Sequence, residues 1–550
     1  MTSTTGFLSL AVLSIAAYAA RTWLLAWRKG KQLKLLCPGG NPTWVFPLGA
    51  LQLILGRYGY PFPGSVGHYY SKFEVYKKHG STCLSTVATW GTTPVYYMTN
   101  VEAIKKVLSD RHVFIKDVRS YEMLNIWGPN VVSAEGDQWK RHRMIANPAF
   151  NQANTELVWK DAMRAIGEWL EELDERGEPG TPIDVSKETA QVTLLVIASS
   201  AFGRHVSYRE HVDKQPPLGH TMPFGAAVNT ALTRLLFKVL TPRFVWNITT
   251  SFSIPFISPL MKETKAAFDA LEKHMLEVTS EARAMILNNE PMDAALLRNM
   301  VKANVQQEGL AKTLTDDELL SNTMTFLLAG HETTAHTVAF ALALIALYPD
   351  VQARIFKEIN YAWPESSPAP GYKEALSNLE YTVATVMETL RVCPAVPRLG
   401  KLAQSDTVIT SLHFSMGENG TIENITPFEV PIEKGTAMMV DIMGLHMNPI
   451  YWGPNPGDFN PENFIDTETY RWPRDAFLGF SGGARSCMGQ RFAVAEAVCL
   501  ITNIVRKYEV RVPSDVAGKS FEEQKGILLG WYPSITSEPT GAKVVFRPRS

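Results

Sequence analysis

The alternation of apolar and polar positions predicts one very long helix around residue 330. Thr315-Asp-Asp-Glu318 is a capping box, in which a threonine and a glutamate satisfy the first backbone donors of a helix, and Pro349 ends the element after Tyr348. At a rise of about 1.5 Å per residue, some thirty residues span roughly 50 Å, enough to cross a large domain.

The middle of this helix is polar, whereas both of its ends are apolar. It reads Ala329-Gly-His-Glu-Thr-Thr334. A buried polar group is costly unless it is paired, and glycine inside a helix costs about 1 kcal/mol relative to alanine. The pattern therefore predicts a functional kink or bulge. A transmembrane helix is the alternative, but it would place His331 and Glu332 near the middle of the bilayer.

A second helical pattern extends from Gln490 to about Lys507, and a glycine-rich stretch with one cysteine, Cys487, directly precedes it. A thiolate there would be stabilised by the free N–H groups and the positive end of the helix dipole. The glycines would let the backbone pass close to a large flat group, and Arg485 suits a carboxylate. The alternative is a glycine-rich turn with a buried, inert cysteine.

The first 34 residues predict a membrane anchor. An apolar run from Phe7 to Ala20 continues past Arg21 to Trp27, and the cations Arg28, Lys29, Lys31 and Lys34 follow. This length suits a bilayer, and the cationic flank predicts that the downstream chain is cytosolic. A cleaved signal peptide is the alternative, but the charges lie on the wrong side and no small-residue cleavage site is evident.

The remaining pattern predicts a mixed globule. Turn-rich segments at 38–42 and 60–64 separate the anchor from it. Alternating apolar residues in Thr82–Trp90 and Thr93–Met98 predict a hairpin around Gly91, and Asn100 is the expected N-cap of a helix to Ser109. Residues 180–310 are mostly helical, and 530–533 and 542–547 are strands. Within residues 180–310, the apolar stretch 252–260 is explained by core packing, whereas the family resemblance described below implies a loop that dips toward the membrane.

Composition restricts the class of protein. The 550 residues carry a net charge of −1, with 45% hydrophobic and 19% charged residues, which indicates one ordinary large core. The composition argues against a nucleic-acid partner, because no cation cluster follows the first forty residues. Five cysteines without a Cys-x-x-Cys pair argue against a disulfide framework and a structural zinc site, and favour a reducing compartment.

Two further helical pairs are ambiguous when taken alone. Trp139 and Arg143 lie one turn apart and share a face, which is either a solvated basic face or a platform for a flat anionic group. Arg141 and His142 between them are expected at the surface. Glu388 and Arg391 are spaced as an i, i+3 ion pair, which at a surface contributes only a few tenths of a kcal/mol.

In their order along the chain, these motifs resemble the cytochrome P-450 family over roughly residues 40–550. Five residues match its haem-binding loop: Phe480, Gly483, Arg485, Cys487 and Gly489. Residues 329–334 resemble the family's oxygen-binding groove, and the helical pairs resemble its Trp-x-x-x-Arg and Glu-x-x-Arg motifs. The resemblance implies one catalytic domain at 35–550. Its fold would be mainly α with a small β-rich lobe, with haem between the long central helix and the cysteine loop.

The resemblance also implies a role for each matching residue. Cys487 would be the axial thiolate of haem b iron. The haem edge and its propionates would be held by Trp139, Arg143, Arg398 and Arg485. Gly330 would leave room for dioxygen, Thr333 would hydrogen-bond it, and Glu332 would lie on the proton-delivery path. Glu388 and Arg391 would lock the proximal face, and Ala395 and Val396 would border the substrate.

The sequence departs from the family in two places. Asn463 occupies a position where the family has arginine or histidine, which puts a three-way ion cluster with Glu388 and Arg391 in doubt. Residues 403–428 are a surface insertion. Sequons at Asn247, Asn419 and Asn424 would stay unmodified in the cytosol.

The resemblance implies a monooxygenase that is anchored in the endoplasmic reticulum membrane and acts on a lipophilic substrate, similar to fungal members of secondary metabolism, with a terpenoid as one candidate. Electrons would come from a separate NADPH-dependent reductase, because no flavin-binding segment follows Cys487. One alternative is a haem protein without turnover. Another is a non-oxygenating isomerase or dehydratase. Thr333 and Glu332 favour monooxygenation, because the reaction needs protons delivered to oxygen.

Overall fold

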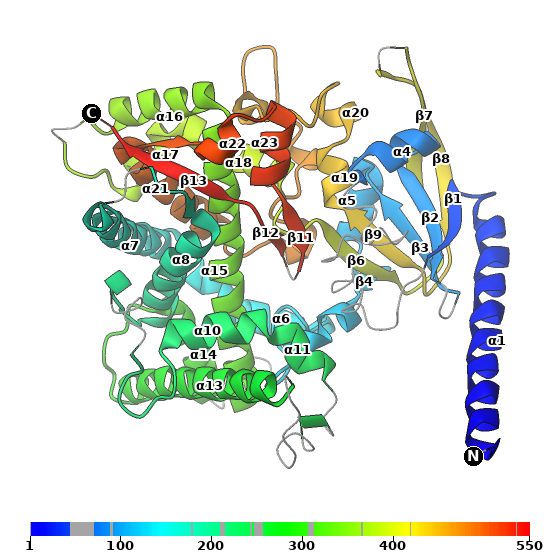
Figure 1. The fold of residues 1–550 in the computed structure, drawn as a ribbon, viewed down its shortest axis with the longest axis horizontal. Helices are drawn as coiled ribbons and strands as arrows, with labels where there is room; N and C mark the ends of the chain where they lie inside the picture. Colours follow the sequence, from blue (N-terminus) through cyan, green and yellow to red (C-terminus); the bar gives the residue numbers. More distant parts are fainter. Residues whose placement is uncertain are drawn as a thin grey trace.

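The computed structural model has a large helical lobe and a smaller β-rich lobe (Figure 1). It describes residues 2–43, 71–88, 92–177, 180–209, 215–241, 245–246, 257–305, 313–364, 367–418, 420–534 and 536–549. The expected mainly helical fold with a small β-rich lobe is confirmed.

The helices of the large lobe surround one central element, α15. The central helix is α15 (Asp316–Leu347). The helices around it are α6 (Gly136–Ala146), α7 (Gln152–Arg176), α8 (Val185–Phe202), α10 (Phe224–Thr233), α11 (Leu235–Leu240), α13 (Ile257–Leu287), α14 (Ala295–Val305), α16 (Pro349–Ala362), α17 (Tyr372–Asn378), α18 (Glu380–Val392), α21 (Gln490–Lys507), α22 (Ser514–Ala517) and α23 (Phe521–Leu528). The predicted helical character of residues 180–310 is confirmed by α8, α10, α11, α13 and α14.

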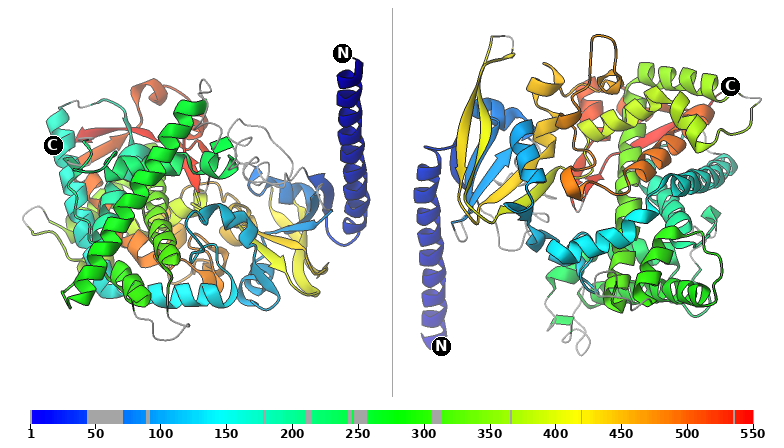
Figure 2. Two further views of the ribbon diagram at one scale, coloured as in Figure 1. Left: turned by 90° about the horizontal axis from the view of Figure 1, so that it is seen from below. Right: turned by 180° about the vertical axis from the view of Figure 1, so that it is seen from behind.

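Helix α15 has 32 residues and crosses the lobe from one side to the other (Figures 1 and 2). The capping box is confirmed, because the Thr315 hydroxyl accepts the Glu318 N–H at 3.1 Å and the Glu318 carboxylate accepts the Thr315 N–H at 3.1 Å. No 3-10 or π turn interrupts residues 329–334, so the predicted bulge is wrong. The central threonines bond to carbonyls one turn earlier and leave the helical hydrogen bonds intact.

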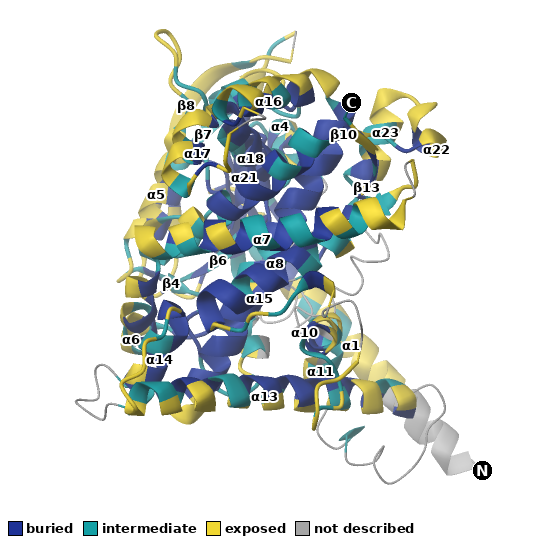
Figure 3. Cartoon of the chain, turned by 90° about the vertical axis from the view of Figure 1, so that its left-hand side faces the viewer, coloured by how far each residue is buried: buried dark blue, intermediate teal, exposed yellow. Residues whose placement is uncertain are grey.

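The core lies where α15 meets α7, α8, α18 and α21, and these helices are dark blue along their inner faces in Figure 3. From Ala335 to Leu347 every residue of α15 is buried. Such a helix is apolar all round because it has protein on every side.

The β-rich lobe contains a six-stranded sheet in the order β1-β2-β3-β9-β6-β4. Its strands are β1 (Gly39–Thr43), β2 (Cys83–Ala88), β3 (Pro94–Met98), β4 (Phe114–Lys116), β6 (Arg398–Ala403) and β9 (Ala437–Asp441). Helices α4 (Glu74–His79), α5 (Val101–Ser109), α19 (Ile442–His446) and α20 (Pro449–Trp452) pack around it. Strands β2 and β3 pair antiparallel, which confirms the two strands of the predicted hairpin. Residues 89–91 between them lie outside the described residues. The Asn100 side chain accepts the Ala103 N–H at 2.9 Å, as predicted for an N-cap.

The segment at 38–42 was expected to be a turn and instead contributes a strand. Strand β1 pairs parallel with β2, and the Ser85 N–H donates to the Pro38 carbonyl at 2.7 Å. Pairing with an existing sheet edge therefore overrides the local preference of proline and glycine. Residues 60–64 lie outside the described residues.

Three smaller sheets complete the part of the chain that the structure describes. The expected insertion is a long hairpin of β7 (Thr407–Met416) and β8 (Ile422–Ile432), with Asn424 exposed on it; Asn247 and Asn419 lie outside the described residues. Strands β11 (Trp531–Pro533) and β12 (Ser537–Pro539) form a short hairpin. Strand β13 (Lys543–Pro548) pairs with β10 (Tyr508–Arg511) and with β5 (Ile183–Asp184). The two predicted C-terminal strands, at 530–533 and 542–547, are therefore confirmed.

The N-terminal helix α1 (Thr2–Leu33) runs beside the β-rich lobe and extends beyond it (Figures 1 and 2). Ala26 and Leu33 are buried, and Lys29 forms an ion pair with Glu433 at 3.1 Å. Among the described residues, no single helix is both long enough and apolar enough to cross a bilayer, although α15 and α16 taken together pass that test across a bend of 109°. In the apolar stretch 252–260, residues 252–256 are outside the description and 257–260 begin α13.

A fully buried ion pair on α18 ties this helix to residues 446–463. Arg391 donates two hydrogen bonds to Glu388, each at 2.6 Å, and both side chains are inaccessible to solvent. The remaining Arg391 donors reach the carbonyls of His446, Pro456 and Asp458. The Asn463 amide donates to Glu388 at 3.1 Å. The third member of the cluster is thus a neutral amide, and the charges balance as a pair.

We expect Arg391→Ala to lower the free energy of unfolding by about 3–5 kcal/mol, because it leaves the Glu388 carboxylate buried without its cation. Urea unfolding followed by circular dichroism measures the loss. The matched control is Lys105→Ala, which breaks the exposed pair with Asp475 and should cost less than about 1 kcal/mol. Equal losses in the two variants would contradict a structural role for the buried pair.

Candidate functional site

The cysteine loop before α21 is held in shape by its own backbone. The Cys487 N–H donates to the Phe480 carbonyl at 2.9 Å, and the Ser486 N–H donates to the Gly483 carbonyl at 3.1 Å. Gly483 has φ +65°, and a Cβ there would lie 2.5 Å from the Leu108 carbonyl oxygen. Glycine is therefore required at this position both for its conformation and for the close approach of α5.

Cys487 lies deep in the fold, yet its side chain is exposed because it faces a cavity. Burial raises the pKa of the Cys487 thiol, while the Gly489 N–H and the Arg143 guanidinium lower it. Gly489 is the N-cap residue of α21, so the sulfur sits at the positive end of a helix dipole.

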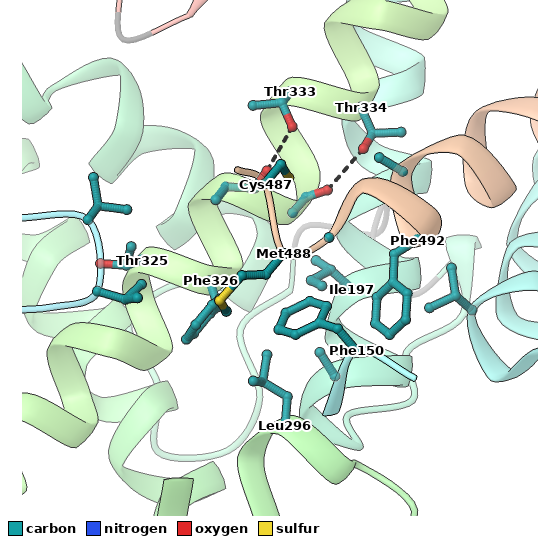
Figure 4. Close-up of a pocket in the computed structure, with 18 of the residues that line it drawn as sticks. Phe150, Ile197, Leu296, Thr325, Phe326, Thr333, Thr334, Cys487, Met488 and Phe492 are labelled. Carbon is teal, nitrogen blue, oxygen red and sulfur yellow. Dashed lines mark hydrogen bonds between the residues drawn. The ribbon is translucent and has the colours of Figure 1, made fainter. Parts of the chain in front are cut away.

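The cavity has two connected parts, since both are lined by Thr333, Thr334, Arg485, Cys487 and Ala493. The first part, shown in Figure 4, has about 1110 Å³ of space between its walls, including its open mouth. Its lining is mostly apolar and includes Phe150, Ile197, Leu296, Phe326, Met488 and Phe492. The second part is lined by Ala395, Val396, Phe480 and neighbouring residues. A large flat apolar group with a sulfur ligand therefore suits this space.

Helix α15 contributes Gly330 and Thr333 to the same cavity. The Thr333 hydroxyl donates to the Ala329 carbonyl at 2.8 Å (Figure 4), so its lone pairs remain available to a ligand. A Cβ on Gly330 would lie 2.7 Å from Ile197 Cδ1. The small size of Gly330 therefore also permits α8 to pack closely against α15.

Glu332 is not among the described residues that line either part of the cavity. Its carboxyl accepts a hydrogen bond from Thr536 at 3.4 Å, at the turn of the β11–β12 hairpin. Burial raises the pKa of Glu332 to about 7, the charge of Glu538 adds to this, and the Thr536 hydrogen bond opposes it. Near neutral pH this carboxyl can both take up and release a proton.

Two arginines lie with Trp139 at the edge of the cavity. Arg485 donates to the Ala134 carbonyl at 2.7 Å and to Glu135 at 2.6 Å, and its guanidinium lies 4.3 Å from the Trp139 ring centre. Arg143 donates to the Ser486 carbonyl at 3.1 Å and lies 5.9 Å from the same ring. Two cations beside an aromatic ring suit the carboxylates and the edge of a porphyrin.

Arg398 is placed differently from these two arginines. It is buried at the start of β6, 3.7 Å from Asp441 and 4.9 Å from the Tyr97 ring centre. It is not among the described residues lining the two cavity parts. The structure thus brings Arg485, Arg143 and Trp139 together at the cavity and leaves Arg398 beside it.

The expectation that His142 lies at the surface is wrong, whereas Arg141 is partly exposed. His142 is buried, with its Nε2 at 3.3 Å from the Glu318 carboxylate, and Arg141 forms an ion pair with the same carboxylate. Helix α6 packs across the N-terminal end of α15, so its basic residues meet the acid of the capping box. A contact between residues so far apart in the chain leaves no signal in either segment alone.

Sequence analysis missed two charged residues in the cavity wall. Lys116 donates to the Val132 carbonyl at 2.6 Å, and burial, together with Arg485, lowers the pKa of Lys116 to about 7. Glu496 of α21 is buried near Thr334, and burial raises the pKa of its carboxyl well above the usual value. An acid inside the apolar run of α21 was the available signal for Glu496. Lys116 gave none.

The imidazole of His446 connects the buried ion pair to the cysteine loop. Its Nδ1 lies 3.0 Å from the Arg391 carbonyl, and its Nε2 accepts the Leu478 N–H at 2.9 Å. The acceptor role of Nε2 assigns the proton to Nδ1. Burial lowers the pKa of His446 to about 3, so the ring is neutral and both bonds persist at physiological pH.

A separate group of metal-ligating residue types is poorly arranged for a cation. His220, His274 and Glu277 bring their ligand atoms within 4.8 Å of one another. The two imidazoles are stacked at 3.8 Å with 5° between their planes, so their lone pairs run side by side. The His274 nitrogens already contact the Met222 carbonyl and the Arg204 guanidinium.

We expect Gly483→Ala to displace the cysteine loop, because alanine at φ +65° costs about 1–2 kcal/mol before the clash with Leu108 is counted. Haem content after purification and the urea unfolding midpoint should both fall. Gly457→Ala is the matched control, since a Cβ at Gly457 meets nothing within 4 Å. Full haem content in Gly483→Ala would refute the requirement for glycine.

Comparison with known proteins gives a consistent result. The Cytochrome P450 family model matches residues 66–536. The chain is 34% identical to Cytochrome P450 monooxygenase 124 of Postia placenta, over 92% of this chain and 94% of the relative. It is 26% identical to Cytochrome P450 monooxygenase prx9 of Penicillium rubens, over 78% of this chain and 76% of that protein. It is 27% identical to Cytochrome P450 3A2 of Rattus norvegicus, over 85% and 89% of the two chains.

Proposed function

Since the chain belongs to the cytochrome P450 family, and is a monooxygenase that binds haem through a cysteine thiolate, we propose that it oxidises a lipophilic small molecule of fungal secondary metabolism. One observation carries the proposal: Cys487 and Thr333, from different elements, line one apolar cavity. The fungal sources of two relatives support the biological setting.

The haem, when bound, supplies the activation of dioxygen and the transfer of one oxygen atom. Cys487 Sγ would ligate the iron, and the Gly489 N–H and the Arg143 guanidinium would stabilise the thiolate. Arg485, Arg143 and Trp139 would hold the propionate edge. For this, Arg485 would exchange its bond to Glu135 for a propionate oxygen, a swap between two carboxylates.

Two residues of α15 would carry the proton chemistry. Thr333 Oγ1 would hold a proton close to the reacting oxygen, because this hydroxyl lines both parts of the cavity. Glu332 would resupply that proton, since its pKa of about 7 lets it exchange protons near neutral pH. Gly330 would keep the wall open beside them. Glu388 and Arg391 would support the cysteine loop through His446 and take no part in the chemistry.

The nature of the substrate follows from the cavity wall. Aromatic and aliphatic side chains dominate the part of the cavity shown in Figure 4, and such a lining favours an apolar ligand over water. We propose a terpenoid as one candidate, because it shares the apolar character of this lining. Ala395 and Val396 would contact it from the second part.

The redox partner and the location are part of the same proposal. Electrons would come from a separate NADPH-dependent reductase. Residues 1–34 would hold the protein at the endoplasmic reticulum membrane with the catalytic domain, residues 35–550, in the cytosol. Exposed apolar residues on α1 support this arrangement, among them Leu10, Val12, Leu13 and Ile15.

We expect Cys487→Ala to abolish the carbon monoxide absorption band that marks thiolate-ligated haem, because no other described cysteine lines the cavity. The reduced protein is mixed with carbon monoxide and its spectrum recorded. Cys499→Ala, on the helix α21 that follows the loop, is the control and should keep the band. Retention of the band in Cys487→Ala would exclude this sulfur as the ligand.

We expect Thr333→Ala to retain haem but to lower product formed per NADPH on the order of tenfold, with the reducing equivalents appearing as peroxide. Water replaces part of the lost proton donor, so the effect is smaller than the full contribution of a general acid. Thr333→Ser is the control and should stay coupled. Unchanged coupling in Thr333→Ala would remove the assigned role. Product formed without dioxygen or NADPH would indicate an isomerase instead.

A further inference from the structure

The β11–β12 hairpin places one hydroxyl between two polar residues of α15. Thr536 is buried, with 4% of its surface exposed, and its Oγ1 lies 3.4 Å from Glu332 Oε1 and 3.1 Å from His336 Nδ1. His336 is also buried, one turn after Glu332 on the same helix. Thr536 lies outside every motif that relates this chain to its family.

The position of Thr536 is fixed by its neighbours on the hairpin. The Ser537 N–H donates to the Ala395 carbonyl at 2.9 Å, and the Ser537 hydroxyl donates to the Pro394 carbonyl at 2.8 Å. The Ser534 N–H donates to the Thr536 carbonyl at 2.9 Å. The hairpin is thus bonded to the segment that carries Ala395, which itself lines the cavity.

Hydrogen-bond arithmetic orients the Thr536 hydroxyl. A hydroxyl donates once, and an ionised carboxylate can only accept. Burial lowers the pKa of His336 to about 3, so its ring is neutral and can donate from Nδ1. With Glu332 ionised, the consistent arrangement is that His336 donates to Thr536 and Thr536 donates to Glu332. This arrangement stabilises the carboxylate.

Glu538 acts in the opposite direction. It lies on β12, two residues after Thr536, and its negative charge favours the protonated form of Glu332. Among the described residues, His336 and His331 on α15 itself are further titratable groups here, and His331 acts on His336. The same hairpin therefore contributes one group that favours the ionised form of Glu332 and one that favours the neutral form.

Building on the function proposed above, we propose that Thr536 is a positioning residue that, oriented by His336, holds Glu332 and with Glu538 sets the pH range over which Glu332 exchanges protons. The hairpin thereby acts on the proton supply through Glu332 and takes no part in the chemistry itself. Thr536 and Glu538 should shift the proton occupancy of Glu332 in opposite directions.

The test is an infrared pH titration of the full-length, haem-loaded protein without reductase or substrate. The protonated carboxyl band of Glu332 is identified by its loss in Glu332→Gln. In the native protein it should disappear as the pH rises through about 7. Thr536→Val, nearly equal in shape, removes the hydrogen bond and should move the midpoint up by about one pH unit. Glu538→Gln should move the midpoint to lower pH, because it removes a negative charge that favours the protonated form of Glu332.

Thr536→Ser is the conservative control and should titrate as the native protein does. A midpoint that is unchanged in Thr536→Val, or that moves in the same direction in Thr536→Val and Glu538→Gln, overturns the proposal. If Thr536→Val fails to fold, Glu538→Gln and Thr536→Ser decide it, because a Glu538→Gln midpoint equal to the native one also overturns it.

The titration needs no turnover, so its outcome is separate from that of the proposed function. With reductase and substrate added, the pH profile of product per NADPH should shift in the same directions as the infrared midpoints. Shifted midpoints with an unmoved coupling profile would support the positioning role of Thr536 and overturn the assignment of Glu332 to proton delivery.

Discussion

One neutral imidazole holds the parts of this molecule on which the site depends. His446 bonds through Nδ1 to the carbonyl of Arg391 and through Nε2 to the N–H of Leu478, and so connects a buried ion pair to the loop that carries Cys487. The ion pair in turn engages three carbonyls through Arg391. The loop that carries the Cys487 sulfur is thus supported by buried polar groups that are hydrogen-bonded to one another. This support is strong because an unpaired polar group in the interior is costly.

The central helix separates the tasks of neighbouring residues by the direction in which they point. Gly330 and Thr333 face the cavity, whereas Glu332 reaches the β11–β12 hairpin. Gly330 and Thr333 are three residues apart and share one face of the helix, whereas Glu332 is rotated by about 100° from Thr333. The acid can therefore be tuned by Thr536 and Glu538 without disturbing the apolar wall that would receive a substrate.

The cations at the cavity edge each have a hydrogen-bond partner within the protein. Arg485 rests on Glu135, Lys116 is held by a carbonyl, and Trp139 lies beside two guanidinium groups. Propionates would take over partners that are already in position, so little side-chain ordering remains to be done on binding. Glu318, the acid of the capping box at the start of α15, also contacts Arg141 and His142 of α6 through its carboxylate.

The sequence alone determined the features that are local in the chain. These are the capping box at Thr315, the N-cap at Asn100, the β2–β3 hairpin and the glycine pattern around Cys487, since each depends on residues within a few positions of one another. Tertiary structure alone decided the burial of His142, the placing of Arg398 beside Asp441 and the contact of Thr536 with Glu332. These contacts join segments that are distant in sequence, often by more than 150 residues, and neither segment carries a signal of the other, because a hydrogen bond or an ion pair exists only once packing has brought both partners together.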